Sequence, residues 1–187
     1  DDPDWAVKAA LVLLQGGSFG RMVVGVDPGP RPGIAILGDG RVLLADTLLS
    51  PEEVAPAVKD FLSFVKTDEL LLRVGHGDPT NRDRIINALW DVTRNIEMVD
   101  ETSTSGRTGH PEAALSIAHT RGELLPSRPR VAPTQGEIRD IQRLSRIESG
   151  GAITIGSALA RQVALGALTL KEAIEKQKRK GVSEGDP

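Results

Sequence analysis

Acidic and histidine side chains follow the predicted strands of this chain or begin the helix that returns to them. They are Asp27, His76, Asp78, Asp100, Glu101, His110 and Glu112. Magnesium and manganese ions prefer oxygen ligands, and two such ions about 3.5–4 Å apart can activate water and stabilise a leaving oxygen on phosphorus. A site of this kind needs three or four carboxylates from different elements, or a histidine in place of one carboxylate. The residue types therefore point to metal-dependent chemistry on a phosphate.

Asp27 ends a short apolar strand, because the run Val-Val-Gly-Val over residues 23–26 leads directly into Asp27, Pro28 and Gly29. An acid at the mouth of a strand can hold a divalent metal ion. Asp-Pro-Gly is also frequent in type II turns, where Pro presets φ near −65° and Gly supplies a positive φ. Taken alone, the turn is the commoner meaning of these three residues.

The other candidates also have structural explanations. Asp78 precedes a proline and is typical of a turn, and His110 and Glu112 can be caps or favourable charges in the first turn of a helix. Asp100 and Glu101 are harder to explain in this way, because adjacent carboxylates at the end of an apolar strand repel each other unless a cation relieves them.

The elements that would position these side chains follow an order typical of a mixed sheet. Strands are predicted over residues 21–27, 33–37, 41–48, 69–75 and 96–101, and helices over 50–66, 80–90 and 111–120. The sequence Gly-Asp-Gly over residues 38–40 predicts a tight hairpin. This order, β-β-β-α-β-α-β-α, predicts an α/β fold with a mixed five-stranded sheet and helices on both faces. Active sites in such sheets gather beyond the carboxyl ends of the parallel strands, which would bring the acids together.

Helical signals also mark the ends of the chain. Residues 5–15 read as a short helix, and the chain after Thr134 looks purely helical. Ser/Thr–Glu pairs three residues apart predict capping boxes: Ser50 with Glu53, Thr134 with Glu137, and Thr169 with Glu172. Ala114, Ile117 and Ala118 form a narrow apolar face suited to close packing on a sheet. We expect an N-terminal helix in residues 1–20, an α/β domain in 21–126 and a helical extension in 127–187.

Composition restricts the class of protein. The 187 residues include no cysteine, so disulfides and thiolate metal sites are excluded and a cytoplasmic location is the expectation. No apolar run approaches the roughly 18 residues that span a bilayer. The net charge of −3 argues against broad coating of nucleic acid, and the absence of tyrosine argues against a base-stacking platform. Basic residues nevertheless cluster late in the chain, where a solvated helical face is their commoner meaning: Arg128, Arg130, Arg139, Arg143, Arg146, Arg161, Lys176, Lys178, Arg179 and Lys180.

Motifs in order along the chain carry a family resemblance: Asp27-x-Gly29-x-x-x-Gly33-x-Ala35, Asp100-Glu101-x-x-Thr104, and the stretch with Ala113, Ala114, Ile117 and Ala118. The order of elements resembles the ribonuclease H fold, and the motifs resemble its RuvC/YqgF branch of Holliday-junction resolvases. The similarity covers about residues 21–122.

The resemblance implies hydrolysis of phosphodiesters in branched DNA or structured RNA, dependent on Mg²⁺ or Mn²⁺. It implies that Asp27 and Glu101 are direct metal ligands. Where the family has one or two aspartates before the alanine-rich stretch, this chain has His110 and Glu112, and histidine can also ligate such metals. The expected metal ligands are Asp27, Asp100, Glu101, His110 and Glu112, and the expected catalytic residues are Asp27, Glu101 and Glu112.

Three functions compete. The leading interpretation is a metal-dependent, resolvase-like nuclease. The second is a binding module that keeps the fold without catalysis, suggested by the missing last aspartate and by the acidic net charge. The third is an ATP-using relative of the actin-like proteins, which need a second strand with an Asp-x-Gly motif that this chain lacks. The helices after Thr134 could form a homodimer surface, cover a sheet edge or grip nucleic acid.

Overall fold

The structure, a computed structural model, describes residues 17–100 and 109–183. The chain divides into two compact units, residues 1–130 and residues 131–187. The helix expected over residues 5–15 lies outside the described residues, as does Glu101. No helix among the described residues is long and apolar enough to cross a membrane.

The first unit is built on a mixed sheet. Its strands are β1 (Ser18–Asp27), β2 (Gly33–Gly38), β3 (Arg41–Thr47), β4 (Lys66–Gly75), β5 (Ile96–Val99) and β6 (Glu123–Leu124). They lie in the order β3-β2-β1-β4-β5-β6, with β1, β4 and β5 parallel to one another. The pairs β1–β2, β2–β3 and β5–β6 are antiparallel. The α/β class is therefore confirmed.

The expected count of five strands is wrong, because the sheet has six. The additional strand, β6, pairs antiparallel with β5 through Leu124 opposite Glu97 and Glu123 opposite Met98. Two residues are too few to show the alternation by which strands are recognised in a sequence.

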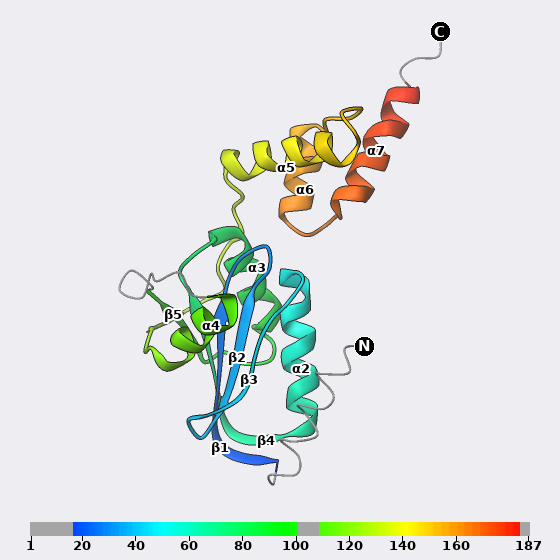
Figure 1. The fold of residues 1–187 in the computed structure, drawn as a ribbon. Helices are drawn as coiled ribbons and strands as arrows, with labels where there is room; N and C mark the ends of the chain where they lie inside the picture. The colour runs from blue at the N-terminus through cyan, green and yellow to red at the C-terminus, as the bar shows by residue number, and fades with distance from the viewer. Residues whose placement is uncertain (1–16, 101–108, 184–187) are drawn as a thin grey trace. The chain divides into compact units, whose positions relative to one another are not determined.

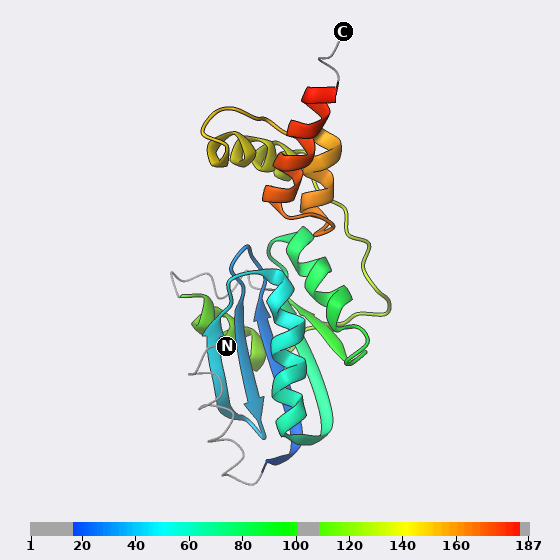
Figure 2. The ribbon, with the colours of Figure 1, turned by 90° about the vertical axis from the view of Figure 1, so that its right-hand side faces the viewer.

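Helices cover both faces of this sheet (Figures 1 and 2). On one face lie α2 (Val54–Phe64), entered through the 3₁₀ turn η1 (Pro51–Glu53), and α3 (Pro79–Leu89). Their apolar residues, among them Val58, Phe61 and Ile86, form the main core with Val24 and Ile36 of the sheet. On the other face lies α4 (His110–His119). The expected placement of helices on both faces is confirmed.

Of two turns predicted from sequence, one forms and the other does not. The hairpin between β2 and β3 is confirmed: Asp39 and Gly40 have φ of 48° and 78°, the positive pair that a type I′ turn requires. The Asp39 carboxylate accepts a hydrogen bond from the amide of Arg21 at 2.9 Å. By contrast, Gly29 is not among the glycines with positive φ, so Asp27, Pro28 and Gly29 do not form the type II turn.

Two predicted helix starts differ in detail: Ser50 is the N-cap residue and Pro51 follows it, as expected, but the predicted capping bond is absent, and α3 begins one residue before Thr80. The Ser50 hydroxyl makes no capping bond, because the first turn is 3₁₀ and the Glu53 amide donates to the Ser50 carbonyl at 3.2 Å. The carboxylate of Glu53 instead accepts from the Leu49 amide at 2.9 Å. The helix expected to open at Thr80 begins at Pro79, and its N-cap is Asp78, whose side chain accepts from the Asn81 amide at 3.2 Å.

The second unit is helical. It contains α5 (Gln135–Glu148), α6 (Ser157–Ala164) and α7 (Leu170–Ser183). Its own core is formed by buried residues of the three helices and of the loop between α5 and α6: Ile138, Ile155, Ala160, Ala173 and Ile174. The capping box of Thr134 with Glu137 is confirmed, and Thr169 and Glu172 make the same pair of bonds.

Candidate active site

Asp27 lies at the carboxyl end of β1 and on the face of the sheet that α4 covers. Side chains alternate between the two faces of a strand. Val24 and Val26 belong to the core under α2 and α3. Val23 packs instead beside Ala114 of α4, so the alternation places Asp27 on the same face as Val23.

Two glycines allow α4 to rest on the strands with backbone against backbone. A Cβ atom at Gly25 would lie 2.3 Å from the carbonyl oxygen of Ala114, and one at Gly33 would lie 2.0 Å from the carbonyl oxygen of His110. Ala114 and Ala118 complete a small apolar cluster with Ala35 and Leu37. The close packing expected of this helix is confirmed, and it sets His110 at the edge of the sheet where β1 ends.

At this edge the Nδ1 atom of His110 lies 3.0 Å from the Oδ2 atom of Asp27. The Asp27 side chain is 17% exposed and that of His110 is 54% exposed. A carboxylate can only accept a hydrogen bond, so this contact requires the proton on Nδ1. In the neutral ring, Nε2 then keeps its lone pair, which can bind a metal ion or accept a proton.

Glu112 points back to the start of its own helix. Its Oε2 atom lies 2.6 Å from where a Cβ atom of Gly109 would stand, and Gly109 is the N-cap residue of α4. A carboxylate in this position is stabilised by the positive end of the helix dipole. The structure thus gives Glu112 a capping environment, in keeping with the structural alternative for this residue.

The structure brings none of the other described candidates into a metal-sized group with Asp27 and His110. Asp100 directly follows β5, which is separated from β1 by β4 and so lies about 10 Å away. Glu101 lies outside the described residues. Asp78 caps α3, and the exposed His76 offers its backbone carbonyl to Arg82.

Among the described residues, no group of three or more histidine and acidic side chains is close enough to hold a metal ion. Asp27 and His110 together supply one oxygen and one nitrogen donor. Mg²⁺ is commonly held by one or two protein side chains, with waters and substrate phosphates completing its octahedron. Because Nε2 lies on the side of the imidazole away from Asp27, each donor fits such an ion separately, and the nitrogen suits a transition metal such as Mn²⁺ better than Mg²⁺.

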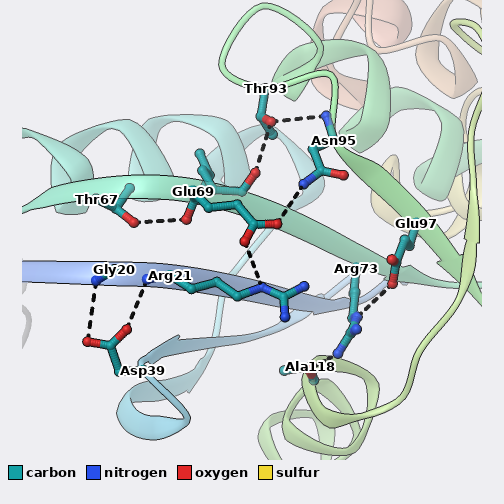
Figure 3. A network of polar contacts seen from close by, with 11 residues as sticks. Gly20, Arg21, Asp39, Thr67, Glu69, Arg73, Thr93, Asn95, Glu97 and Ala118 are labelled. Atoms are coloured by element: carbon teal, nitrogen blue, oxygen red, sulfur yellow. Dashed lines mark hydrogen bonds and ion pairs between the residues drawn. The ribbon is translucent and has the colours of Figure 1, made fainter.

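A partly buried ion pair, which sequence reasoning missed, anchors the other end of α4 (Figure 3). The Nε atom of Arg73 lies 2.8 Å from Oε2 of Glu97, and the two side chains are only 11% and 15% exposed. Arg73 also donates to the carbonyl of Ala118 at 2.7 Å, near the C-terminus of α4. The sequence did contain a signal for this pair, because each of two apolar strands is interrupted by one charged residue. Arg73 and Glu97 are these residues, and they lie opposite each other in β4 and β5.

The environment of Glu97 favours its charged form. Burial raises the pKa of Glu97, but hydrogen bonds from Arg73 and from the Gly122 amide, together with the charges of Arg73 and Arg121, outweigh burial. The pKa of Glu97 consequently lies below its ordinary value. The anchor of α4 is thus an ionised pair that also binds the chain just after the helix.

A family model described as a three helical bundle domain matches residues 134–180. Comparisons with curated proteins and with solved structures gave no match. The matched segment corresponds to α5, α6 and most of α7 and contains neither the sheet nor Asp27. The α/β unit is therefore interpreted from its own geometry.

Proposed function

We propose that the chain is a metal-dependent nuclease of the ribonuclease H-like, resolvase-like type, which hydrolyses phosphodiesters of structured nucleic acid. The observation that carries this proposal is the 3.0 Å contact between Asp27 and His110 at the carboxyl end of β1. Asp27 belongs to the first motif of the resemblance, and His110, 83 positions later, stands where the family has an aspartate before the alanine-rich stretch. Their contact joins the first-strand acid to the start of the alanine-rich helix.

The order of elements supports the same proposal. Three antiparallel strands are followed by two αβ units, α2–β4 and α3–β5, whose strands are parallel to β1, and then by α4. This is the order β-β-β-α-β-α-β-α on which the resemblance rests. The terminal strand β6 is added after this series and lies beyond β5, away from the site.

Each residue of the pair has a defined part in this function. Asp27 would hold Mg²⁺ or Mn²⁺ through one carboxylate oxygen, while its Oδ2 atom fixes the imidazole of His110. His110 would present Nε2, on the side of the ring away from Asp27, either to a second ion or to a water molecule from which it takes a proton. The bound ion would polarise the phosphoryl group and lower the pKa of a bound water. Glu101, Asp100 and Glu112 remain proposed contributors to ion binding.

A second candidate function is a nucleic-acid or protein binding module without catalysis. It is favoured by the capping environment of Glu112, which occupies the place of a family aspartate yet contacts Gly109. Under this hypothesis the Asp27–His110 pair is a structural link between β1 and α4.

The two functions are separated by cleavage of a labelled four-way DNA junction in Mg²⁺ or Mn²⁺. Replacing a group that only supports a metal ligand costs about 10–100-fold in activity. Asp27 is a proposed direct ligand, so Asp27→Asn is expected to lose about 100-fold or more. Asp68→Asn, which alters an exposed acid at the start of β4, is the matched control and should cleave normally. Cleavage that survives Asp27→Asn undiminished contradicts the proposal, and no cleavage by the unaltered chain favours the binding module.

A further inference from the structure

Helix α5 carries a row of exposed arginines that its own unit does not use. Arg139, Arg143 and Arg146 are all exposed, and with 3.6 residues per turn they lie within about 60° of one another around the helix. We refer to these three residues as the arginine stripe. The buried residues Ile138 and Ser145 lie about 110–130° around the helix from the stripe, and the three exposed arginines do not pack within the bundle.

The stripe is weakly neutralised. Arg143 lies 3.9 Å from Asp140, at the limit of an ion pair, and Arg139 donates to the backbone carbonyl of Gln135. Within residues 17–100 and 109–183, Arg146 has no acidic partner. Three guanidinium groups therefore face solvent with most of their hydrogen-bonding capacity unused.

Charge in the chain is segregated toward this unit. Residues 131–187 hold nine lysines and arginines against seven aspartates and glutamates, a net charge of +2, whereas residues 1–130 have −5. A cationic unit on an acidic chain favours a polyanionic partner.

The chemistry of the stripe favours phosphates over other anions. Guanidinium groups form bidentate hydrogen bonds with phosphate, and all three positions are arginine rather than lysine. From residue 139 to residue 146 the helix rises about 10 Å, which corresponds to about three phosphates along one nucleic-acid strand. Residues 134–180 contain no Phe, Tyr or Trp, so no stacking on bases is available there.

We propose that the arginine stripe of α5 binds the phosphate backbone of nucleic acid without reading its sequence. The partner class rests on the proposed nuclease function, while the surface is independent of the Asp27–His110 pair. The three-helix unit is then the part of the chain that supplies affinity for substrate.

The test measures binding of the full chain to a fluorescent four-way junction by anisotropy, in EDTA so that cleavage does not interfere. The variant carries Arg139→Gln, Arg143→Gln and Arg146→Gln. Each phosphate contact contributes about 0.9 to the slope of log affinity against log salt, so the slope should become shallower by about 2 to 3. The loss should be similar for junctions of unrelated sequence.

Two controls keep the result interpretable. Arg41, Lys59 and Lys66, exposed residues of the sheet unit, are replaced by Gln to remove the same charge elsewhere, and this variant should retain the original slope. Replacing the stripe by three lysines keeps the charge and should restore most of the affinity, which a misfolded unit would not do.

Several outcomes overturn the inference. These are an unchanged slope in the stripe variant, an equal loss in the sheet-unit control, or no binding by the unaltered chain, which would leave an acidic protein surface as the partner. Cleavage assays score the nuclease function separately. Cleavage that needs Asp27 but not the stripe refutes only this inference, and stripe-dependent binding without cleavage refutes only the nuclease function.

Discussion

Gly33 lies against the first residue of α4, such that a Cβ atom at Gly33 would stand 2.0 Å from the carbonyl oxygen of His110. No real Cβ atom tolerates backbone at this distance. The absence of a side chain at one strand position thus determines where the imidazole of His110 can be held relative to Asp27.

The variant Gly33→Ala should therefore shift α4 away from the sheet. Forcing extra atoms into a packed contact costs about 1–3 kcal/mol, and urea unfolding should show a loss in this range. Gly29→Ala is the matched control, because nothing lies within 4 Å of its Cβ position and its φ is not positive. A Gly33→Ala chain as stable as Gly29→Ala would contradict the described contact.

The Arg73–Glu97 pair should contribute far more than its exposed counterpart on the same sheet. Removing Arg73 by Arg73→Ala leaves the partly buried carboxylate of Glu97 without its partner, which should cost more than the loss of an exposed pair but less than that of a fully buried one, about 3–5 kcal/mol. Arg21 and Glu69 form a half-exposed pair at 3.2 Å, and Arg21→Ala should cost about 0–1 kcal/mol. Denaturant unfolding measures the free energy of unfolding that each variant loses. Equal losses in Arg73→Ala and Arg21→Ala would contradict a larger contribution from the less exposed pair.

The lowered pKa of Glu97 predicts the direction of an acid effect. Its ordinary pKa is 4.5 and its folded pKa lies lower, so the unfolded chain binds more protons in this range. The stabilisation is complete above the unfolded pKa and is lost as the pH falls through the folded pKa. Unfolding measured between about pH 6 and pH 3 should show a shallower loss of stability in Glu97→Gln than in the unaltered chain. An identical pH dependence in both would mean that another group is responsible.

The nitrogen donor of His110 predicts a preference among metal ions. Imidazole suits transition metals, whereas carboxylate suits Mg²⁺, so the unaltered chain should bind Mn²⁺ more tightly than Mg²⁺. Calorimetry should show His110→Asp reducing this preference, and His119→Asp at the far end of α4 leaving it unchanged. Equal preferences in the unaltered chain and in His110→Asp would remove His110 from the proposed ligands.

Features encoded by neighbouring residues were predicted well from sequence. The turn at Asp39 and Gly40 follows from two residues that accept positive φ, and the cap of α5 follows from Thr134 and Glu137. The cap expected at Ser50 failed because a 3₁₀ turn redirects the amide of Glu53 to a backbone carbonyl. Whether a backbone amide donates to a side-chain hydroxyl or to a backbone carbonyl depends on turn geometry, which residue types alone do not determine.

Features that depend on distant pairing were predicted only in part. Asp27 and His110 were both recognised as candidates, but their direct contact depends on the closeness that Gly25 and Gly33 allow, and Gly25 had not been singled out. The strand β6 exists only through its pairing with β5, so its two residues carry no signal of their own.

The separation of 83 residues between Asp27 and His110 has a kinetic consequence. Contacts between residues far apart in sequence carry a large loop-closure cost and form late, after intervening elements have shortened the effective loop. Here the intervening elements include β4, which pairs with β1, and β5, which pairs with β4, and their pairing would shorten the loop that α4 closes. The Asp27–His110 contact should therefore form late in folding. Ion binding that requires both side chains would appear during refolding only after α4 has packed on the assembled sheet.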